Sequence, residues 1–260
     1  MRKVAVKLVL VASFVGLSFG NALALLDVDV AAGVWQQSLD GNICYKGDTL
    51  DAKNGLKLDQ QLNPYVSARV NLPILPGLYF MYTPAGFSGS GTLSHNFTFG
   101  DTQFQANQWF DSKLVLNHYD VAFFYGIPLL NTATMGIMDA ELGLNARFYD
   151  LETEITQGNL KRGIRTIIPV PMLYARLKIA PPVIDIIALE TEGRGIVAGS
   201  NHVVSGVARL KVLVPAFPLL KLSLGYRYDS IKVDASDLAG VSVSTDMKAS
   251  GPFAEVALEF

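Results

Sequence analysis

Apolar and polar residues alternate one by one along several segments of this chain. In the C-terminal segment, the residues that share one apolar face are Ala254, Val256, Leu258 and Phe260. Glu255 and Glu259 lie between them, on the opposite face. The same period of two recurs in the segments 66–72, 140–148 and 221–229. Because successive side chains of a strand point to opposite sides of a sheet, this period predicts β-strands with one apolar face.

The most apolar long stretch of the chain does not fit a membrane-spanning helix. The stretch 164–189 contains four prolines and four charged residues. Yet 50% of all residues are hydrophobic and only 17% are charged, against about 25% charged in an average soluble domain. Only helices and closed barrels satisfy every backbone polar group in lipid. Alternation and composition together therefore predict an all-β fold, an antiparallel up-and-down transmembrane β-barrel. The alternative is a soluble β-sandwich that buries the apolar face in its core.

Composition also excludes two broad classes of protein. A disordered chain combines low hydrophobicity with high charge, which is the opposite of this sequence. A nucleic-acid-binding protein carries a basic patch, whereas the formal net charge here is −2.

The first 24 residues have the pattern of a Sec-type signal peptide. Arg2, Lys3 and Lys7 form a basic region, and the apolar run 8–19 follows it. Ala22 and Ala24 then form an A-x-A cleavage site. We expect residues 1–24 to be removed, which leaves 25–260 as a single barrel domain in the outer membrane.

The period of two predicts ten strands. Their expected ranges are 26–40, 56–72, 77–97, 108–126, 134–151, 165–179, 184–198, 202–214, 220–233 and 243–260. In the third range, Gly86, Gly89 and Gly91 indicate a bulged strand, although an extra hairpin would also fit. Eight tyrosines of these strands fit the aromatic girdles that barrels carry at both membrane interfaces: Tyr79, Tyr82, Tyr119, Tyr125, Tyr149, Tyr174, Tyr226 and Tyr228.

The connections between the expected strands alternate in character. Proline-rich apolar turns occur at 73–77, 128–131, 180–183 and 215–218. Longer polar segments occur at 41–55, 99–107, 152–163, 199–201 and 234–240. Periplasmic turns of outer-membrane barrels are short and external loops are longer. We therefore expect the proline turns in the periplasm and the polar loops outside the cell.

Charged residues of both signs fall on the strand faces that would line the lumen. These candidate lumen-lining residues are Arg69, Asp120, Asp139, Glu141, Arg147, Arg176, Lys178, Arg209, Lys211, Arg227 and Glu255. One interpretation is a set of ion pairs that fills the lumen, because buried charges are costly unless they are paired. The other is a narrow polar channel or a binding pocket. Side chains just fill a barrel of eight strands, so ten strands favour a filled lumen.

Several short motifs resemble those of a known family. They are AAGVW at 31–35, GSGTL at 89–93, FTF at 97–99, PMLYA at 171–175, LGYR at 224–227 and GPF at 251–253. The chain resembles a family of Gram-negative outer-membrane β-barrel proteins of about this length that have no established biochemical role. The resemblance implies a barrel fold and an outer-membrane location, and it implies no catalytic residues.

The last strand ends in an aromatic residue. Val256, Leu258 and Phe260 resemble the signal that the barrel-assembly machinery reads. We expect that machinery and periplasmic chaperones as partners during biogenesis. Outer-membrane lipid and lipopolysaccharide are the partners expected afterwards, and nucleic acid is not expected.

The sequence contains no spacing typical of metal or nucleotide sites, and we expect neither cofactor nor metal. Cys44 is the single cysteine and no intrachain disulfide is possible. We expect a structural barrel or a narrow small-solute channel without catalysis. One alternative is an outer-membrane hydrolase of the lipid deacylase or protease type, built on His118 and Asp120, which share a strand face. The other is a barrel that binds a hydrophobic or surface ligand through its outer loops.

Overall fold

The computed structural model describes residues 27–72, 75–182, 184, 186–235 and 243–260. The expected signal peptide, including Ala22 and Ala24, lies outside the described residues. Within them, no helix is both long enough and apolar enough to cross a membrane.

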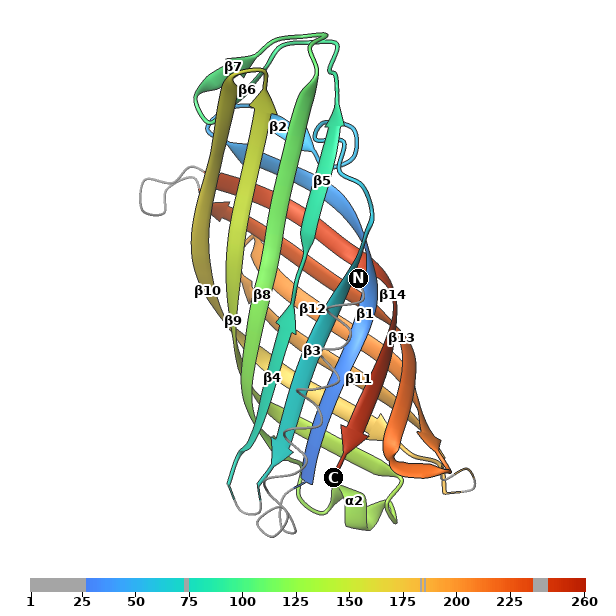
Figure 1. The fold of residues 1–260 in the computed structure, drawn as a ribbon. Helices are drawn as coiled ribbons and strands as arrows, with labels where there is room; N and C mark the ends of the chain where they lie inside the picture. Colours follow the sequence, from blue (N-terminus) through green and yellow to red (C-terminus); the bar gives the residue numbers. More distant parts are fainter. Residues whose placement is uncertain (1–26, 73–74, 183, 185, 236–242) are drawn as a thin grey trace, which may run out of the picture.

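The described strands occupy ten positions of one antiparallel barrel (Figure 1). The positions are β1 (Asp27–Tyr45), β3 (Gln61–Asn71), β4 (Gly77–Thr83) with β5 (Gly86–Gly91), β8 (Phe110–Gly126), β9 (Met138–Gln157), β10 (Leu160–Ile179), β11 (Ile187–Ala198), β12 (Asn201–Val214), β13 (Phe217–Ala235) and β14 (Val243–Glu259). β4 and β5 share one position because both pair with β8. β14 pairs with β1 and closes the sheet, with Val30 opposite Leu258. The predicted ten-stranded antiparallel barrel is confirmed.

Shorter elements lie at the two ends of the barrel. β2 (Thr49–Asp51) pairs with the upper part of β1. β6 (Phe97–Phe99) and β7 (Thr102–Phe104) form a separate hairpin at the same end. The helical turn α2 (Leu130–Ala133) lies at the opposite end, beside the C-terminus (Figure 1). We call the end with α2 the lower end and the other the upper end.

Some predicted boundaries were wrong because the strands continue beyond the apolar alternation. The expected loop 152–163 is instead the top of β9 and β10, joined by a two-residue turn at Gly158 and Asn159. The expected loop 41–55 begins with five more residues of β1 and contains β2, and the expected loop 99–107 contains most of the β6–β7 hairpin. The third strand is interrupted at Pro84 and Ala85 and not at its glycines. At this gap, the backbone N–H of Ala85 donates to Asn117 Oδ1 at 2.9 Å, and the N–H of Leu116 donates to the carbonyl oxygen of Ala85 at 2.7 Å.

The outer surface of the barrel changes character along its length. On β9, Leu142, Leu144 and Phe148 point outward and are 58%, 67% and 41% exposed. Farther up the same face, Asp150, Glu152 and Glu154 follow. Exposed apolar residues of the other strands extend this surface around the lower part of the barrel. Together they form a belt that comprises Val30, Val34, Val66, Leu78, Phe80, Phe123, Leu142, Leu144, Leu173, Leu189, Leu210, Leu222, Leu224 and Val256. A band of this kind is the lipid-facing surface of a transmembrane barrel.

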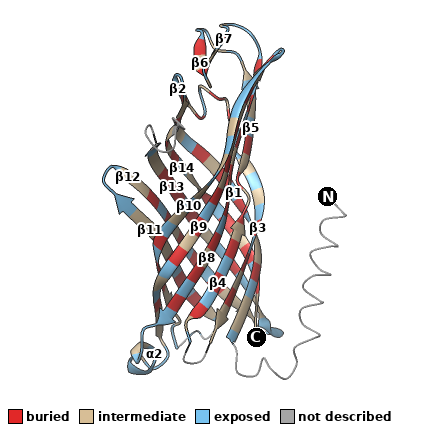
Figure 2. Ribbon diagram, turned by 90° about the vertical axis from the view of Figure 1, so that its left-hand side faces the viewer, coloured by how far each residue is buried: buried red, intermediate tan, exposed pale blue. Residues whose placement is uncertain are grey.

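The interior changes in the opposite sense. Inward residues of β9 in the lower part are Glu141, Asn145 and Arg147, whereas Leu151 and Ile155 face inward in the upper part. Buried and exposed residues therefore alternate over the whole strand length (Figure 2), but the chemistry of the two faces is exchanged. The lower part has the pattern of a membrane barrel, and the upper part has that of a water-soluble one.

The tyrosine prediction was correct for some residues and wrong for others. Tyr82 and Tyr119 stack at 4.6 Å between ring centroids, and Tyr119, Tyr226 and Tyr228 are exposed where the apolar belt ends. Tyr125 is exposed lower down. However, Tyr79, Tyr149 and Tyr174 face inward and are at most 5% exposed, because their hydroxyls belong to the polar interior.

Proline positions explain where the sheet is discontinuous. In the described chain, β10 pairs with β11 only from Leu173 to Ile179, and above Leu173 its one partner is β9. The odd-numbered residues of β10 direct their backbone groups toward β11, and among them Pro169 and Pro171 have no N–H to donate. The hydrogen-bond ladder between β10 and β11 therefore ends at Leu173, two positions after Pro171, as expected for proline at a strand edge.

The facing of the strands predicts the cost of a charge on the lipid side. Leu224 is 69% exposed within the belt, so Leu224→Arg should lower the free energy of unfolding in lipid vesicles by roughly 2–4 kcal/mol. Asn42→Arg is the matched control, because Asn42 also faces outward but lies in the polar upper part between Asp246 and Asp51. Urea titrations measure both. Equal costs would contradict the assigned belt.

The two ends of the barrel can be assigned by labelling. We expect the upper end to face the cell exterior, since the proline turns and the described ends of the chain share the lower end. In a Cys44→Ser background, Asn159→Cys should react with a membrane-impermeant maleimide on intact cells. Asp139→Cys, at the lower opening of the lumen, should react only after the outer membrane is permeabilised. The reverse pattern would show that the barrel is inserted the other way round.

Candidate functional site

Four arginines and four glutamates meet inside the lower part of the barrel. This lower network consists of Arg69, Arg176, Arg194, Arg209, Glu141, Glu190, Glu192 and Glu255, none more than 8% exposed. Its centre is Arg209 on β12. The guanidinium contacts Glu255 on β14 at 2.9 Å (Nη1 to Oε1), Glu190 on β11 at 3.2 Å (Nε to Oε1) and Glu192 through Nη2. One side chain thereby joins three strands that lie within four consecutive positions of the barrel.

The network continues from Arg209 to the opposite wall. Arg176 donates from Nη2 to Glu190 Oε2 at 2.5 Å and from Nη1 to Glu141 Oε1 at 2.7 Å. Glu141 also accepts from Arg69 on β3. Because four positive and four negative charges are present, the lower network is electrically balanced. Balance and mutual hydrogen bonding are the conditions under which buried charges are tolerated.

An aromatic layer packs against the arginines. The guanidinium of Arg194 lies 4.8 Å from the ring centroid of Tyr79 and 5.3 Å from that of Tyr174. Arg69 lies 5.0 Å from the rings of both Tyr79 and Phe124. Cation–π contacts are stronger when the cation is desolvated, as it is here.

A second balanced cluster lies above the first. This upper network consists of Asp120, Arg147, Arg227, Asp229 and His118, at most 8% exposed. Arg147 donates two hydrogen bonds to Asp120, from Nε to Oδ1 at 2.8 Å and from Nη2 to Oδ2 at 3.0 Å. Arg227 donates from Nη2 to Asp229 Oδ2 at 2.9 Å, and its guanidinium lies 4.4 Å from the ring centroid of Trp35.

The surroundings of His118 define its tautomer. Its Nε2 lies 2.9 Å from Arg227 Nη2, which can only donate, so Nε2 accepts. Its Nδ1 lies 3.2 Å from the carbonyl oxygen of Leu116, which can only accept, so Nδ1 carries the proton. The imidazole is therefore neutral and has both nitrogens occupied.

An apolar plug closes the interior above the upper network. Loop residues Leu50, Leu56 and Leu58, together with Phe97, Phe99 and Phe104 of the hairpin, are at most 7% exposed and pack against the inner wall. Gly89 allows this packing, since a Cβ there would lie 2.0 Å from the carbonyl oxygen of Lys57.

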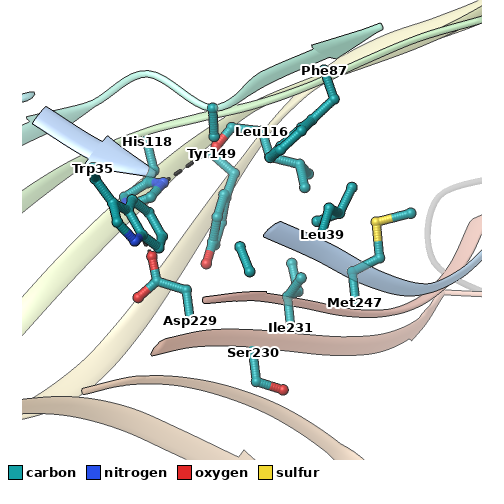
Figure 3. Close-up of a pocket in the computed structure, with 12 residues that line it drawn as sticks. Trp35, Leu39, Phe87, Leu116, His118, Tyr149, Asp229, Ser230, Ile231 and Met247 are labelled. Atoms are coloured by element: carbon teal, nitrogen blue, oxygen red, sulfur yellow. Dashed lines mark hydrogen bonds and ion pairs between the residues drawn. The ribbon is translucent and has the colours of Figure 1, made fainter. Parts of the chain in front are cut away.

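A cavity of about 20 Å³ lies between the plug and the upper network. Figure 3 shows Trp35, His118, Tyr149 and Asp229 on one side of it and Leu39, Ile231 and Met247 on the other. This volume holds about one water molecule. A larger hollow of about 440 Å³ opens at the lower end, between β3, β4 and β8, beside Asp139 and Glu141.

The candidate lumen residues all lie on inward faces, but not in one group. Arg69, Glu141, Arg176, Arg209 and Glu255 are in the lower network, whereas Asp120, Arg147 and Arg227 are in the upper one. Lys211 contacts Asp29 at 3.2 Å and Glu259 at 3.1 Å below the lower network. Asp139, with a side chain 44% exposed, and the partly buried Lys178 lie at the lower opening.

Sequence reasoning missed Glu190, Glu192, Arg194 and Asp229. The alternation of β11 contained the signal, since Glu190, Glu192 and Arg194 are two residues apart. It was obscured because the outward residues between them, Thr191 and Gly193, are not strongly apolar.

The histidines show no arrangement of a hydrolase within the described residues. His118 Nε2 lies 3.9 Å from Asp120 Oδ2, and no serine or cysteine among the described residues bonds to this ring. His202 Nε2 lies 3.1 Å from Ser230 Oγ, but Ser230 is only 3% exposed, so a substrate could not reach its hydroxyl. His95 is exposed on a loop. No group of acidic, histidine or cysteine side chains in the described chain could hold a metal ion.

Comparisons with known proteins give fold-level similarities. No protein-family model and no curated protein matches the chain. Among solved structures, Neisserial surface protein A is 14% identical, with 91% of this chain and 98% of that chain covered and a TM-score of 0.35. The translocator domain of the autotransporter NalP from Neisseria meningitidis is 10% identical, with 90% and 88% covered and a TM-score of 0.42. The outer membrane protein OprG from Pseudomonas aeruginosa is 9% identical, with 90% and 95% covered and a TM-score of 0.29.

The central position of Arg209 predicts a large effect of its removal. Arg209→Met leaves Glu190, Glu192 and Glu255 without their shared cation, and should lower the free energy of unfolding by about 3–5 kcal/mol. Lys113→Met is the control, because the exposed Lys113–Glu152 pair should contribute less than about 1 kcal/mol. Urea titration in vesicles measures both. Similar small losses would show that the lower network is hydrated.

Proposed function

We propose that this protein is an outer-membrane β-barrel with a closed lumen, which acts as a structural barrel and not as a solute channel. The observation that carries the proposal is the low exposure of charged side chains that span the bore. A water-filled bore would expose the side chains that line it, whereas Arg147 and Asp120 are 0% exposed and Arg209 is 8% exposed.

Two further features support a closed lumen. The apolar plug fills the bore above the upper network, so the path would have to pass a packed cluster as well as the ion pairs. The cavity beneath the plug has room for about one water molecule. It is too small for a hydrophobic ligand, which argues against the ligand-binding alternative at this position.

The location and partners are part of the same proposal. An even number of antiparallel strands with a lipid-facing belt is typical of single-chain barrels of the bacterial outer membrane. Outer-membrane lipid and lipopolysaccharide would then surround the belt. Phe260 pairs with Val28 through two backbone bonds of 2.8 and 3.2 Å and so completes the closing strand. An assembly machinery that reads Val256, Leu258 and Phe260 would act on this closing element.

Reconstitution in planar lipid bilayers tests the closed lumen. The folded wild-type protein should give no stepwise ionic current, because no continuous aqueous path crosses either network. Heat-modifiable migration on gels should verify that the protein added is folded.

The control is Arg194→Gln, which changes the charge of the lower network without touching the outer surface, since Arg194 is 2% exposed. Stepwise current in the wild type, with an ion selectivity that Arg194→Gln alters, would show a conducting bore. That result would favour the narrow-channel alternative.

A further inference from the structure

The turns at the lower end are apolar although the lumen opening beside them is charged. The segments 127–137 and 214–220 contain no charged residue and no histidine. Beyond Ile127, their large exposed apolar side chains form, with Leu75 and Ile184 from the other two turns, what we call the apolar rim: Leu75, Leu129, Met135, Ile184, Phe217 and Leu219. Asp185, in the turn of Ile184, lies outside the described residues. The turns at the upper end, by contrast, contain Lys46 and Asp101.

Two rim residues are highly exposed and also have a backbone conformation that is unfavourable for residues with a Cβ. Leu129 and Met135 are 78% and 87% exposed, more than any other large apolar side chain in the described chain. Both have positive φ angles, 66° and 53°. Glycine or asparagine is the usual residue in this conformation, because a Cβ makes it costly. Large apolar side chains at such positions indicate an apolar contact supplied from outside the chain.

Most backbone amides around α2 are hydrogen-bonded within the same end of the barrel. The amides of Ile127, Leu130 and the five residues 133–137 all donate to carbonyl oxygens of the same end of the barrel. Met138 donates to the side-chain oxygen of Thr134, and Pro128 has no N–H. A segment can move from water into lipid at low cost only when its backbone groups form hydrogen bonds within the protein.

The apolar rim is continuous with the lipid-facing belt. Ile127 and Tyr125, both exposed, connect Leu129 to the outward face of β8, and Leu222 connects Leu219 to the outward face of β13. The charged groups of this end, such as Asp29, Lys211 and Glu259, point instead into the lumen opening, where they pair with one another.

We propose that the apolar rim is inserted in the phospholipid interface of the leaflet on the lower side, so that turns as well as strands anchor the barrel. Apolar side chains beside satisfied backbone are favoured at the boundary between headgroups and acyl chains. The inference rests on the proposed function, in which the barrel is inserted in a membrane. It goes further, because a barrel can be inserted through its belt while its turns remain in water.

The test uses the full barrel in phosphatidylcholine vesicles, with an environment-sensitive fluorophore on single cysteines in a Cys44→Ser background. Met135→Cys and Phe217→Cys report on the rim. Both labels should show blue-shifted emission, quenching by acyl-brominated phosphatidylcholine and protection from aqueous iodide. Asn159→Cys, at the opposite end, should show water-like emission and strong quenching by iodide.

Other outcomes would overturn the proposal in distinguishable ways. If iodide quenches the Met135 and Asn159 labels equally, the rim lies in water. If the rim labels are protected from iodide but not quenched by brominated lipid, a second copy of this chain covers the rim. Leu224→Cys on the belt separates the two proposals. If brominated lipid quenches the Leu224 label but not the Met135 label, the barrel is inserted and only the proposal for the rim is wrong. If it quenches neither label, insertion of the barrel is itself contradicted.

Discussion

Pairing of buried charges inside the barrel is the constraint on which the rest of the structure depends. Desolvation of a single guanidinium or carboxylate costs several kcal/mol, so each must be compensated by opposite charge and hydrogen bonds. Arg209 meets this requirement with three glutamates, and Arg147 meets it with Asp120 on the neighbouring strand. Arg69 on β3 contacts Glu192 on β11, five positions away around the barrel, at 3.3 Å. The ion pairs therefore hold opposite walls at a fixed separation and occupy the bore. Stability and the proposed closure of the lumen arise from the same contacts.

The exchange of inner and outer chemistry along the strands divides the molecule into two environments. Below Tyr149, apolar residues face lipid and charged residues face inward. Above it, acidic and basic residues face outward and leucines and phenylalanines form a core. Strand geometry is the same in both parts, since the side-chain period of two does not depend on the solvent. The position of the exchange indicates where the membrane ends, and it means that the upper part is stabilised by the hydrophobic effect as a soluble domain is.

Prolines and turns determine how this barrel ends. Pro171 removes a donor that would face the last residues of β11, and β9 and β10 rise above the β11–β12 hairpin because β11 ends at Ala198. At the lower end, prolines stand in turns, and most of the amides around α2 are bonded within that end of the barrel. The two ends therefore differ, because β10 above Leu173 leaves one strand edge without a neighbouring strand in the described chain. In lipid an unpaired donor is costly, and at an exposed strand edge it invites unwanted pairing.

The sequence by itself determined the ten strand positions and the inward facing of the charged residues that it named, because a period of two can be read from local order alone. It assigned Tyr79, Tyr149 and Tyr174 to the wrong face. It also placed the four proline turns at one end. It did not determine the true ends of β9 and β10, since alternation persists where the apolar and polar faces exchange. Nor did it determine which inward charges would meet. Arg69 and Glu141 are 72 positions apart, and only closure of β14 on β1 and the register of each strand pair bring such residues together. Whether a charged lumen is open or filled is therefore decided by tertiary structure, because it depends on distances across the barrel that no local pattern contains.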